Sequence, residues 1–511
     1  MSILIDNVSR RDALKTMGIT AGFVLSASVV PRGLRALLMG DATGDLEPSV
    51  YLAIQEDGTV RVYVHRVEMG QGSRTGLTQI IADELEADWK RLRVMPAYGD
   101  KKFGSQNTDG SSSIRQFYDA FRTAGATART MLERAAAARW GVDPSQVEAR
   151  NHLVRNKVSG ATLDYGALVA AAQALPVPAP ESLHLKSKAD FRYIGKPVKN
   201  VYAEEFVTGR AMFGQDIMRP GMVFAVAARP PVVGGKVTGY DKAAAMAVDG
   251  VIDVVELPVY AFPMGFQPLG GVAVVATNTW AAMQGRNALK ATFDEGPRNG
   301  SYDTLDYEKV LWAAIDAGGR ETYARGDVEA ALASSARRLK ADYFVPHQHH
   351  IPMEPPAAVA EWDGGKLSIW TSCQDPQAVQ TTTAPFVGVA AEDIYVETTL
   401  LGGAFGRKSK PDFAVEAAVI AKAVGKPVKM VWAREDDVHH GFYHAISAQR
   451  VEVGLDVSGK IEAWDHRAAY PSLMEVAGGG EQPGAVDFEL GPLVDQPLSV
   501  PAFRARSGDA P

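Results

Sequence analysis

The sequence predicts a mixed α+β (α/β) fold with several domains. The chain has 511 residues, of which 46% are hydrophobic and 22% charged, a composition that supplies enough core for several globular domains. Segments in which apolar and polar residues alternate predict strands, and they are interspersed with longer segments that predict helices. Two glycine-rich loops, far apart in the sequence, each follow a predicted strand and precede a predicted helix.

Net charge and cysteine content limit the classes of function. The formal net charge is -7 and no block of lysine or arginine stands out, which argues against nucleic acid as a partner. The single cysteine, Cys373, excludes an internal disulfide, a cysteine-based zinc site and an iron–sulfur cluster ligated within this chain. Any redox chemistry must therefore come from a bound cofactor or from a partner.

Residues 1–45 are predicted to be a twin-arginine signal and a linker rather than part of the fold. Arg10 and Arg11 precede an apolar run from Met17 to Val30 that is too short to span a bilayer comfortably. The alternative is a chance arginine pair before an ordinary helix. Because the twin-arginine route exports folded proteins, we expect a cofactor protein in the periplasm. No clean cleavage site follows, so association with the inner membrane is a further expectation.

The first folded block is predicted over residues 46–180. Its opening segment, "SVYLAIQEDGTVRVYVHRVEMG", alternates apolar and polar residues about an Asp-Gly turn and predicts a β-hairpin. Gly70 and Gly72 then lie at a strand end, and Thr75 is the expected cap of a helix that runs to about Asp88. The loop lacks the G-x-G-x-x-G spacing of a Rossmann turn.

Within the first block, a polar loop, "TDGSSSIRQF", leads into a long alanine-rich helix, and a proline-rich linker begins at Leu175. Three further segments are predicted after this block. Residues 190–300 predict a small α/β domain, in which "GGVAVVATNTWAAMQGRNALKATFDEG" forms a strand, a helix and a strand. Residues 330–470 form the last block, and residues 471–511 are predicted to be a connector.

The last block contains "VETTLLGGAFGRKSKPDFAVEAAVIAKAVGKPVKMVW", which predicts a strand, a glycine loop, a helix and a strand. A phosphate loop of a nucleotide hydrolase requires Gly-Lys-Ser in succession, but Arg407 separates Gly406 from Lys408. The glycines still allow a ligand to approach the backbone closely. Helix-opening N–H groups attract anions, so the loop predicts an anionic ligand.

Several motifs, taken in order, resemble the large molybdopterin-binding subunits of the xanthine oxidase and aldehyde oxidoreductase family. The motifs are Glu68-Met69-Gly70-Gln71-Gly72, Pro352-Met353-Glu354-Pro355, Leu401-Gly402-Gly403-Ala404-Phe405-Gly406-Arg407-Lys408 and Trp432-Ala433-Arg434-Glu435-Asp436-Asp437. The early position of the Met-Gly-Gln-Gly loop and the twin-arginine pair both resemble the isoquinoline 1-oxidoreductase β-subunit branch.

The resemblance implies the identity of each domain. Residues 46–180 would be part of the second molybdopterin-binding domain, permuted to the N-terminus, and residues 330–470 the first. Residues 190–300 would be a hammerhead-like domain inserted between them.

The resemblance also implies a cofactor, namely molybdopterin with molybdenum, expected in its cytosine dinucleotide form. A single glycine loop is compatible with an ordinary tight turn, but two such loops together favour a long, flat, anionic ligand. The cofactor-binding residues implied are Gly70, Gln71, Gly72, Ser111, Ser112 with Ser113 nearby, Gly402, Gly403, Ala404, Phe405, Gly406 and Arg407.

The substrate side of the site is less defined. His347, His349 and His350 suggest a metal site, but no further cluster completes it, so we expect structural roles and no protein-ligated metal. Glu354 is either a structural carboxylate or a pocket wall. Relatives of this branch often carry an arginine near His444, and this chain departs from that pattern, which leaves substrate recognition open.

In the family, a glutamate in a late Gly-x-Gly-Glu-Pro context acts as the catalytic base, and we expect it to be absent here. Glu481 follows a glycine, but Gln482 intervenes before Pro483 and no helix-forming run follows. We therefore expect residues 471–511 to lead into a missing C-terminal segment, which would lie in a separate half of a split subunit or be lost by truncation.

Two functions follow from the resemblance. The first is the molybdopterin-binding subunit, or its N-terminal part, of a periplasmic molybdenum hydroxylase. It would oxidise an aldehyde or an N-heteroaromatic compound with oxygen from water. Electrons would pass to a small [2Fe–2S] subunit and onward to a cytochrome c. The alternative is a non-catalytic remnant that binds only cofactor or partner.

Overall fold

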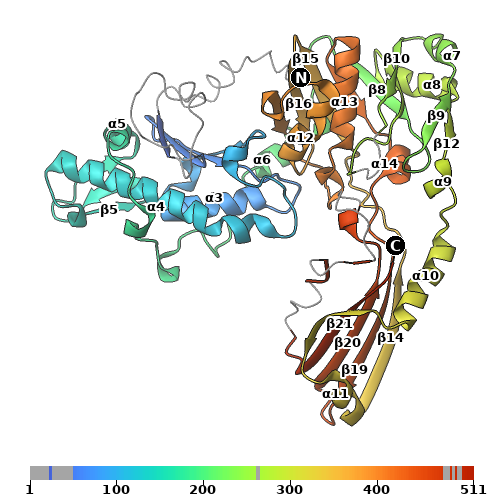
Figure 1. The fold of residues 1–511 in the computed structure, drawn as a ribbon. Coiled ribbons are helices and arrows are strands. Elements are labelled where there is room, and N and C mark those ends of the chain that lie inside the picture. The colour runs from blue at the N-terminus through green and yellow to red at the C-terminus, as the bar shows by residue number, and fades with distance from the viewer. Residues whose placement is uncertain are drawn as a thin grey trace. The chain divides into compact units, whose positions relative to one another are not determined.

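The computed structural model describes residues 22–25, 50–259, 265–475, 484–485, 489–491 and 498–510. The arginine pair of the predicted signal and Glu481 lie outside these residues. The described chain mixes helices and strands throughout, as the sequence predicts (Figure 1). None of the described helices is both long and apolar enough to cross a bilayer.

The chain forms two compact units, each built from separate segments. Unit 1 comprises residues 1–225 and 352–431, and unit 2 comprises residues 226–351 and 432–511. These units divide the chain differently from the predicted boundaries, because residues 330–470 contribute to both. Sequence neighbours alone do not reveal such a division, since it depends on which segments pack together.

Unit 1 contains both glycine loops. Its helices and strands are β1 (Gly22–Leu25), β2 (Leu52–Gln55), β3 (Val60–Val64), α3 (Ser73–Glu84), β4 (Leu92–Pro96), α4 (Ser112–Trp140), β5 (Val147–Arg150), β6 (Leu153–Asn156), β7 (Thr162–Asp164), α5 (Val169–Gln173), α6 (Ala203–Val207), β15 (Ala357–Asp363), β16 (Lys366–Thr371), α12 (Pro376–Val387), β17 (Ile394–Thr398), α13 (Asp412–Val424) and β18 (Val428–Val431). Strand β8 (Val223–Ala228) begins in unit 1 and ends in unit 2.

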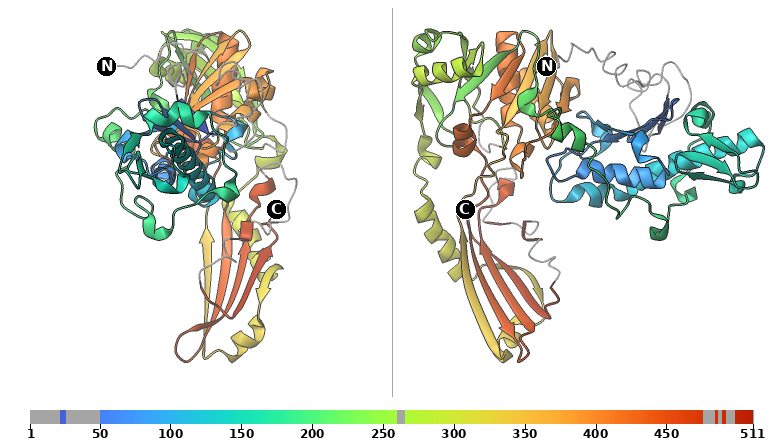
Figure 2. Two further views of the ribbon diagram at one scale, coloured as in Figure 1. Left: turned by 90° about the vertical axis from the view of Figure 1, so that its left-hand side faces the viewer. Right: turned by 180° about the vertical axis from the view of Figure 1, so that it is seen from behind.

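The first part of unit 1 confirms the predicted hairpin and corrects two other predictions. Strand β1 pairs antiparallel with β2, so residues 22–25 belong to the fold, whereas residues 1–45 were predicted to be a signal and a linker outside it. The predicted helix start is also corrected. Strands β2 and β3 pair antiparallel, and β4 lies parallel to β3. Helix α3 begins at Ser73, with Gly72 as its N-cap, so the prediction of Thr75 as the cap is wrong. Instead, the Thr75 hydroxyl accepts a hydrogen bond from the N–H of Val201. Helices α3 and α4 lie side by side and share an apolar core (Figures 1 and 2).

The second part of unit 1 confirms the strand, loop, helix and strand predicted around residue 400. Strands β18, β15, β16 and β17 follow one another in the sheet. Strand β17 is parallel to β16, and β18 is antiparallel to β15. The glycine loop leaves the end of β17, and α13 begins after it. The interior of α13 is rich in alanine and valine, and most of its residues are buried.

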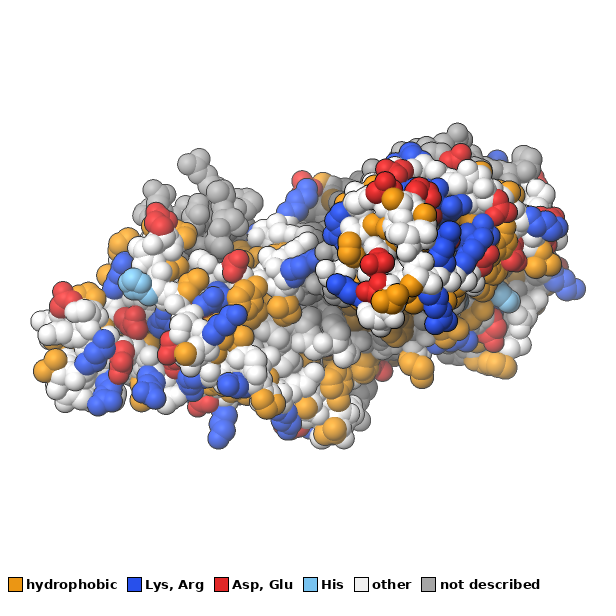
Figure 3. Space-filling view, turned by 90° about the horizontal axis from the view of Figure 1, so that it is seen from below, with side chains coloured by type: hydrophobic (Ala, Val, Ile, Leu, Met, Phe, Trp, Pro, Cys, Tyr) orange, Lys and Arg blue, Asp and Glu red, His pale blue; other side chains and the backbone are white. Residues whose placement is uncertain are grey.

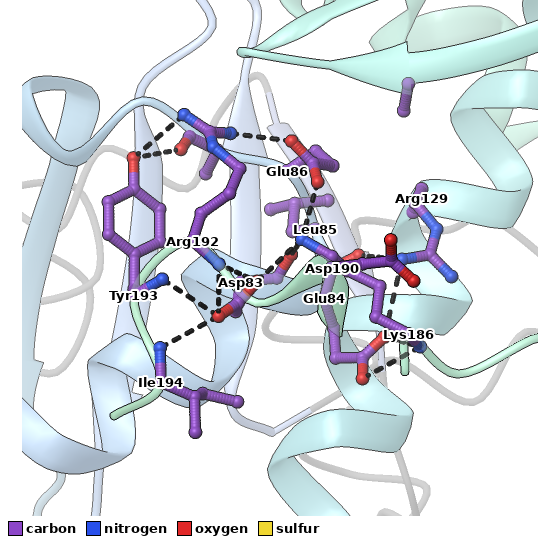
Figure 4. Close-up of polar contacts among 12 residues, drawn as sticks. Asp83, Glu84, Leu85, Glu86, Arg129, Lys186, Asp190, Arg192, Tyr193 and Ile194 are labelled. Atoms are coloured by element: carbon purple, nitrogen blue, oxygen red, sulfur yellow. Dashed lines mark hydrogen bonds and ion pairs between the residues drawn. The ribbon is translucent and has the colours of Figure 1, made fainter. Parts of the chain in front are cut away.

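The segment that follows the proline-rich stretch, residues 186–194, is held in place by buried acids at the end of α3 (Figure 4). The Asp83 carboxylate accepts hydrogen bonds from the backbone N–H groups of Arg192, Tyr193 and Ile194 at 2.8–3.1 Å. It also pairs with the Lys186 ammonium at 2.6 Å. Burial alone would raise the pKa of Asp83, but these hydrogen bonds outweigh it and lower the pKa. The segment is therefore bonded to the fold rather than a free linker.

Unit 2 combines the predicted small α/β domain with a long antiparallel sheet. Its elements are β9 (Lys236–Gly239), α7 (Lys242–Met246), β10 (Val251–Leu257), β11 (Gly271–Ala276), α8 (Thr279–Leu289), β12 (Thr292–Asp294), α9 (Gly296–Asn299), α10 (Thr304–Asp316), β13 (Arg320–Arg325), α11 (Val328–Ser334), β14 (Arg337–Val345), α14 (Arg434–His440), β19 (Ser447–Leu455), β20 (Ile461–Ala469) and β21 (Ala502–Gly508). The predicted order of strand, helix and strand is present as β11, α8 and β12.

The end of the chain is part of the unit 2 sheet. The strand order is β13-β21-β20-β19-β14, so β21 is an inner strand between β13 and β20. Its neighbours β20 and β19 are labelled in Figure 1. Phe503 in β21 is only 2% exposed. The connector predicted over residues 471–511 therefore contains a packed strand. The pattern of its side chains did not reveal this, because its pairing partners come from other parts of the sequence.

Positive and negative side chains are mixed over the molecular surface shown in Figure 3. No large area of that face carries lysine and arginine alone. This distribution agrees with the formal net charge of -7. An extended basic surface of the kind that binds nucleic acid is not seen on this face.

Candidate functional site

The two glycine loops lie side by side within unit 1, although more than 300 residues separate them in the sequence. We call residues 68–72 the first loop and residues 401–408 the second loop. The N–H of Leu401 donates a hydrogen bond to the Glu68 carbonyl oxygen at 3.0 Å. Val67, Leu401 and Ala404 form a small buried cluster beneath this contact. The two loops are therefore joined directly through their backbones.

The first loop is organised by a buried carboxylate. Glu68 accepts hydrogen bonds from the N–H groups of Gly70 at 3.1 Å, Gly72 at 2.8 Å and Arg74 at 3.2 Å. Gly70 and Gly72 adopt φ values of 104° and 78°, which favour glycine. A side chain added at either glycine would meet nothing within 4 Å. The Glu68 carboxylate thus binds the N–H groups at the start of α3. The side of the loop toward which a side chain of Gly70 or Gly72 would point is not covered by other residues.

Gln71 folds back onto the first loop. Its Oε1 accepts a hydrogen bond from the Met69 N–H at 2.9 Å. Its Nε2 donates to the Val67 carbonyl at 3.0 Å and to the Ser73 hydroxyl at 2.9 Å. The side chain therefore stiffens the loop. Both Nε2–H donors are used, so a ligand could bond to the amide without displacing a bond only by donating to Oε1.

The second loop rests on a buried ion pair. The Lys408 ammonium donates to Oε2 of Glu354 at 2.7 Å, and Lys408 is fully buried. The same oxygen accepts from the Gly402 N–H at 3.0 Å, and the Gly402 carbonyl accepts from the Glu354 N–H at 2.9 Å. A Cβ at Gly402 would lie 2.6 Å from the Glu354 Cβ. Glu354 was predicted to be either a structural carboxylate or a pocket wall, and these contacts support the structural role.

Arg407 and Phe405 differ in the direction of their side chains. Arg407 is fully buried and forms a bidentate pair with the Asp412 carboxylate at 2.8 and 2.9 Å. Its guanidinium thus fastens the loop to the start of α13. Phe405 is 65% exposed and has a φ of 56°, a left-handed conformation that is uncommon outside glycine. Such strained, exposed residues cluster at binding sites.

Ser111 and Ser112 lie at the start of α4. Thr108, just before this helix, connects it with the first loop. The Thr108 hydroxyl accepts from the Val67 N–H at 2.9 Å, beside the first loop. Thr108 also exchanges two hydrogen bonds with Gln374, at 2.7 and 3.0 Å. Gln374 in turn accepts from the Gly406 N–H of the second loop at 3.0 Å.

Thr108 and Gln374 therefore connect the start of α4 with both loops, and sequence reasoning missed both of them. No motif indicates their role, because it arises from residues that are far apart in the chain. The glycine, serine and phenylalanine residues predicted from the resemblance are brought to one region.

A histidine lies in the aromatic core below the first loop. His65 is 1% exposed, and its ring centroid lies 4.2 Å from that of Phe117 and 5.4 Å from that of Tyr51. Burial, together with the smaller effect of the neighbouring Arg66 charge, lowers the pKa of His65 from 6.5 to about 3. The imidazole is therefore neutral in the folded protein.

We expect this histidine to make stability depend on pH. Because the unfolded state binds a proton at His65 below about pH 6.5 and the folded state does not, the free energy of unfolding should fall as the pH is lowered, by up to about 1.4 kcal/mol per pH unit. Urea unfolding of the wild type and His65→Phe at pH 7, 6 and 5 measures this. The variant should lose that part of the slope, whereas the exposed-site control His184→Phe should keep it. Equal slopes in all three proteins would rule out this role of His65.

The histidines considered as metal ligands lie in unit 2. His347 hydrogen-bonds with the Tyr302 hydroxyl at 2.8 Å and with the His444 carbonyl at 3.1 Å. His350 and His444 have ring centroids 4.3 Å apart. Within the described ranges, no group of three or more histidine, cysteine or acidic side chains is arranged to hold a metal ion. The contacts of His347 are those of a structural residue.

Comparison with known proteins identifies two domains. Residues 7–213 match a family described as "Molybdopterin cofactor-binding domain", and residues 315–472 match a second family with the same description. These ranges contain the first and second loops, respectively. The match is independent of the loop geometry described above.

Two relatives match most of the chain. It is 30% identical to "Isoquinoline 1-oxidoreductase subunit beta" of Brevundimonas diminuta, over 89% of this chain and 64% of the relative. It is 31% identical to "Membrane-bound aldehyde dehydrogenase [pyrroloquinoline-quinone]" of Gluconacetobacter polyoxogenes, over 91% of this chain and 60% of the relative. The chain thus spans under two thirds of the length of both relatives.

Among solved structures, quinoline 2-oxidoreductase from Pseudomonas putida 86 aligns with a TM-score of 0.44 and 19% identity. The alignment covers 60% of this chain and 43% of that chain.

Proposed function

This chain carries the molybdopterin-binding domains of the xanthine oxidase family, and from this premise we propose that it is the molybdopterin-binding subunit, or a part of it, of a molybdenum hydroxylase. Its substrate would be an aldehyde or an N-heteroaromatic compound, and water would be the source of oxygen. The proposal rests on the names of the relatives for substrate class and on the site for cofactor binding.

One observation carries the proposal: the two loops and the start of α4 are joined by hydrogen bonds within one compact unit. A pterin with a phosphate-containing tail is long, flat and anionic, so it requires close backbone approach at several places. Gly70 and Gly72 present an open face, and Gly403 and Phe405 adopt left-handed conformations in the second loop. These features fit such a ligand.

The residues of the chain have distinct roles in this proposal. Glu68 and Glu354 fix the two loops from below, and Gln374 sets their spacing from Thr108. Gly402, Gly403 and Gly72 would bind the cofactor through the backbone, and the exposed Phe405 ring would exclude water from its face. The bound molybdenum centre would supply the redox chemistry of the hydroxylation. The carboxylate that serves as base is not assigned to a described residue.

Partners follow from the chemistry. Because the single Cys373 is buried and there is no second cysteine among these 511 residues, an iron–sulfur cluster would have to be ligated outside them. We propose a small [2Fe–2S] subunit as the electron acceptor, a cytochrome c beyond it, and the cytosine dinucleotide form of the cofactor.

The experiment is to purify the chain from cells that make the cofactor, with any co-purifying subunits, and to measure molybdenum, pterin and nucleotide content. Oxidation of benzaldehyde and of isoquinoline with a dye acceptor then tests the reaction. Cofactor with dye reduction supports the hydroxylase. Cofactor without oxidation of either compound supports a protein that only binds cofactor or partner. Folded protein without cofactor contradicts both.

We further propose periplasmic location through twin-arginine export. The double variant Arg10→Lys/Arg11→Lys should leave the protein in the cytoplasm, because recognition depends on the arginine pair. Cell fractionation measures this, and Arg32→Lys/Arg35→Lys in the same segment is the matched control that should still be exported. If the Arg10 and Arg11 variant reaches the periplasm at the wild-type level, the export proposal is wrong.

A further inference from the structure

Arg66 is a buried cation beside the first loop that the proposed function leaves unused. Its side chain is fully buried, and Nη2 donates to Oε1 of Gln116 at 3.2 Å. Its guanidinium carbon lies 4.8 Å from the centroid of the Phe117 ring. Across the described part of the chain, Nε and Nη1 of Arg66 have no hydrogen-bond partner. Leaving charged donors buried and unbonded is costly, so their retention requires an explanation.

The guanidinium lies next to the N-terminal end of α4. This helix has 29 residues and begins after Gly110 and Ser111, both in the left-handed conformation, with no side chain capping its first N–H groups. Gln116, the partner of Arg66, is in the first turns of this helix. The Ser112 N–H donates to the Asp109 carbonyl at 3.0 Å, but no side chain caps the start of the helix. A helix N-terminus beside a buried guanidinium is an arrangement that favours an anion.

Other charges near this site must also be considered. The carboxylates of Asp109 and Asp375 act on Arg66 and oppose the lowering of its pKa by burial. Asp375 accepts hydrogen bonds from the N–H groups of Gln377 and Ala378 at the start of α12, and Asp109 accepts one from Asn107. Lys410 is a further cation influenced by the same two carboxylates. An arginine remains charged here, because its pKa lies far above neutrality.

We propose that Arg66 binds a phosphoryl oxygen of the molybdopterin cofactor through Nε–H and Nη1–H, at the N-terminal end of α4. This assignment rests on the proposed function and deepens it, because it gives the anionic tail of the cofactor a specific cation. The planar guanidinium offers two parallel donors to a phosphoryl group, which an ammonium does not.

The test separates a binding role from a structural one. Full-length protein is prepared from cells that cannot make molybdopterin, and thermal midpoints are measured with and without inorganic pyrophosphate. The variants are Arg66→Met and Arg66→Lys. The matched control is Arg74→Met, because Arg74 is also buried but has partners for Nε, Nη1 and Nη2 in Arg66, Tyr202 and Thr398.

We expect pyrophosphate to raise the midpoint of the wild type. Arg66→Met should keep or raise the midpoint of the cofactor-free protein and abolish the pyrophosphate shift, and Arg66→Lys should retain part of the shift. Arg74→Met should lower the midpoint and keep the shift. In protein from cofactor-producing cells, Arg66→Met should hold pterin about ten- to a hundredfold more weakly, as expected for lost hydrogen bonds to a charged group.

Three results would overturn the assignment. The first is no pyrophosphate shift in the wild type, and the second is a lowered midpoint with an intact shift in Arg66→Met. The third is equal pterin content in Arg66→Met and in the wild type when both are purified from cofactor-producing cells. That result removes Arg66 from the cofactor site but leaves the proposed function in place. Wild-type protein that contains no pterin when it is purified from cofactor-producing cells contradicts both the role of Arg66 and the proposed function.

Discussion

Replacing Glu354 with leucine should lower the free energy of unfolding by about 3–5 kcal/mol, because it leaves the buried Lys408 ammonium without its counter-charge. Glu354 is 9% exposed and Lys408 is fully buried, so water cannot replace the lost partner. The variant also leaves the Gly402 N–H without an acceptor, since both donors share the same carboxylate oxygen. Urea unfolding of the purified chain measures the change.

The control for this prediction is a double-mutant cycle. Lys408→Met should also destabilise by about 3–5 kcal/mol, whereas Glu354→Leu/Lys408→Met should lose much less than the sum, because no buried charge remains unpaired. Additive losses would show that the two residues act independently. That outcome would contradict the view that the ion pair supports the second loop.

Gly403→Val should sharply reduce the molybdenum and pterin content of the protein while the fold persists. Gly403 has a φ of 85°, and a Cβ there would lie 3.1 Å from the Phe405 ring and 3.6 Å from the Pro352 Cα. A β-branched residue is strained in this conformation and would displace the backbone from the cofactor. Metal analysis of the purified protein and circular dichroism measure the two effects.

The matched control is Gly425→Val. Gly425 also has a positive φ, of 62°, but it ends α13, and a Cβ there would meet nothing within 4 Å. It therefore carries a similar backbone penalty without a contact to the second loop. Unchanged molybdenum in Gly403→Val, or an equal loss in both variants, would remove the second loop from the cofactor site.

Local sequence patterns predicted the elements that carry the site. Alternation of apolar and polar residues about a turn predicted the hairpin of β2 and β3, and glycines followed by apolar periodicity marked both loop–helix junctions. These predictions succeed because each depends on residues close together in the chain. The alanine-rich run that becomes α4 is of the same kind.

The contacts that organise the site were not predictable in this way. Glu354 and Lys408 are 54 residues apart, and Gln374 and Thr108 are 266 apart, so no local pattern links them. The cap of α3 was predicted wrongly because the Glu68 carboxylate supplies the acceptor and Gly72 turns the chain. A hydroxyl at Thr75 satisfied the local rule but lay inside the helix.

Packing on a larger scale was also not readable from local patterns. The range of residues 330–470 matches one molybdopterin-binding family over residues 315–472, but its segments pack into both compact units, dividing near Ile351 and Val431. Strand β21 belongs to a sheet whose other strands lie before residue 470. In both cases the arrangement is decided by packing between distant segments, which periodicity does not encode.

The central claim is that the two glycine loops form a single molybdopterin site. The most direct measurement is X-ray diffraction at the molybdenum absorption edge from crystals of the cofactor-loaded protein. We expect an anomalous peak beside Phe405 in the second loop, with pterin density reaching Gly72 in the first. A molybdenum peak remote from both loops, or pterin density in contact with only one of them, would contradict it.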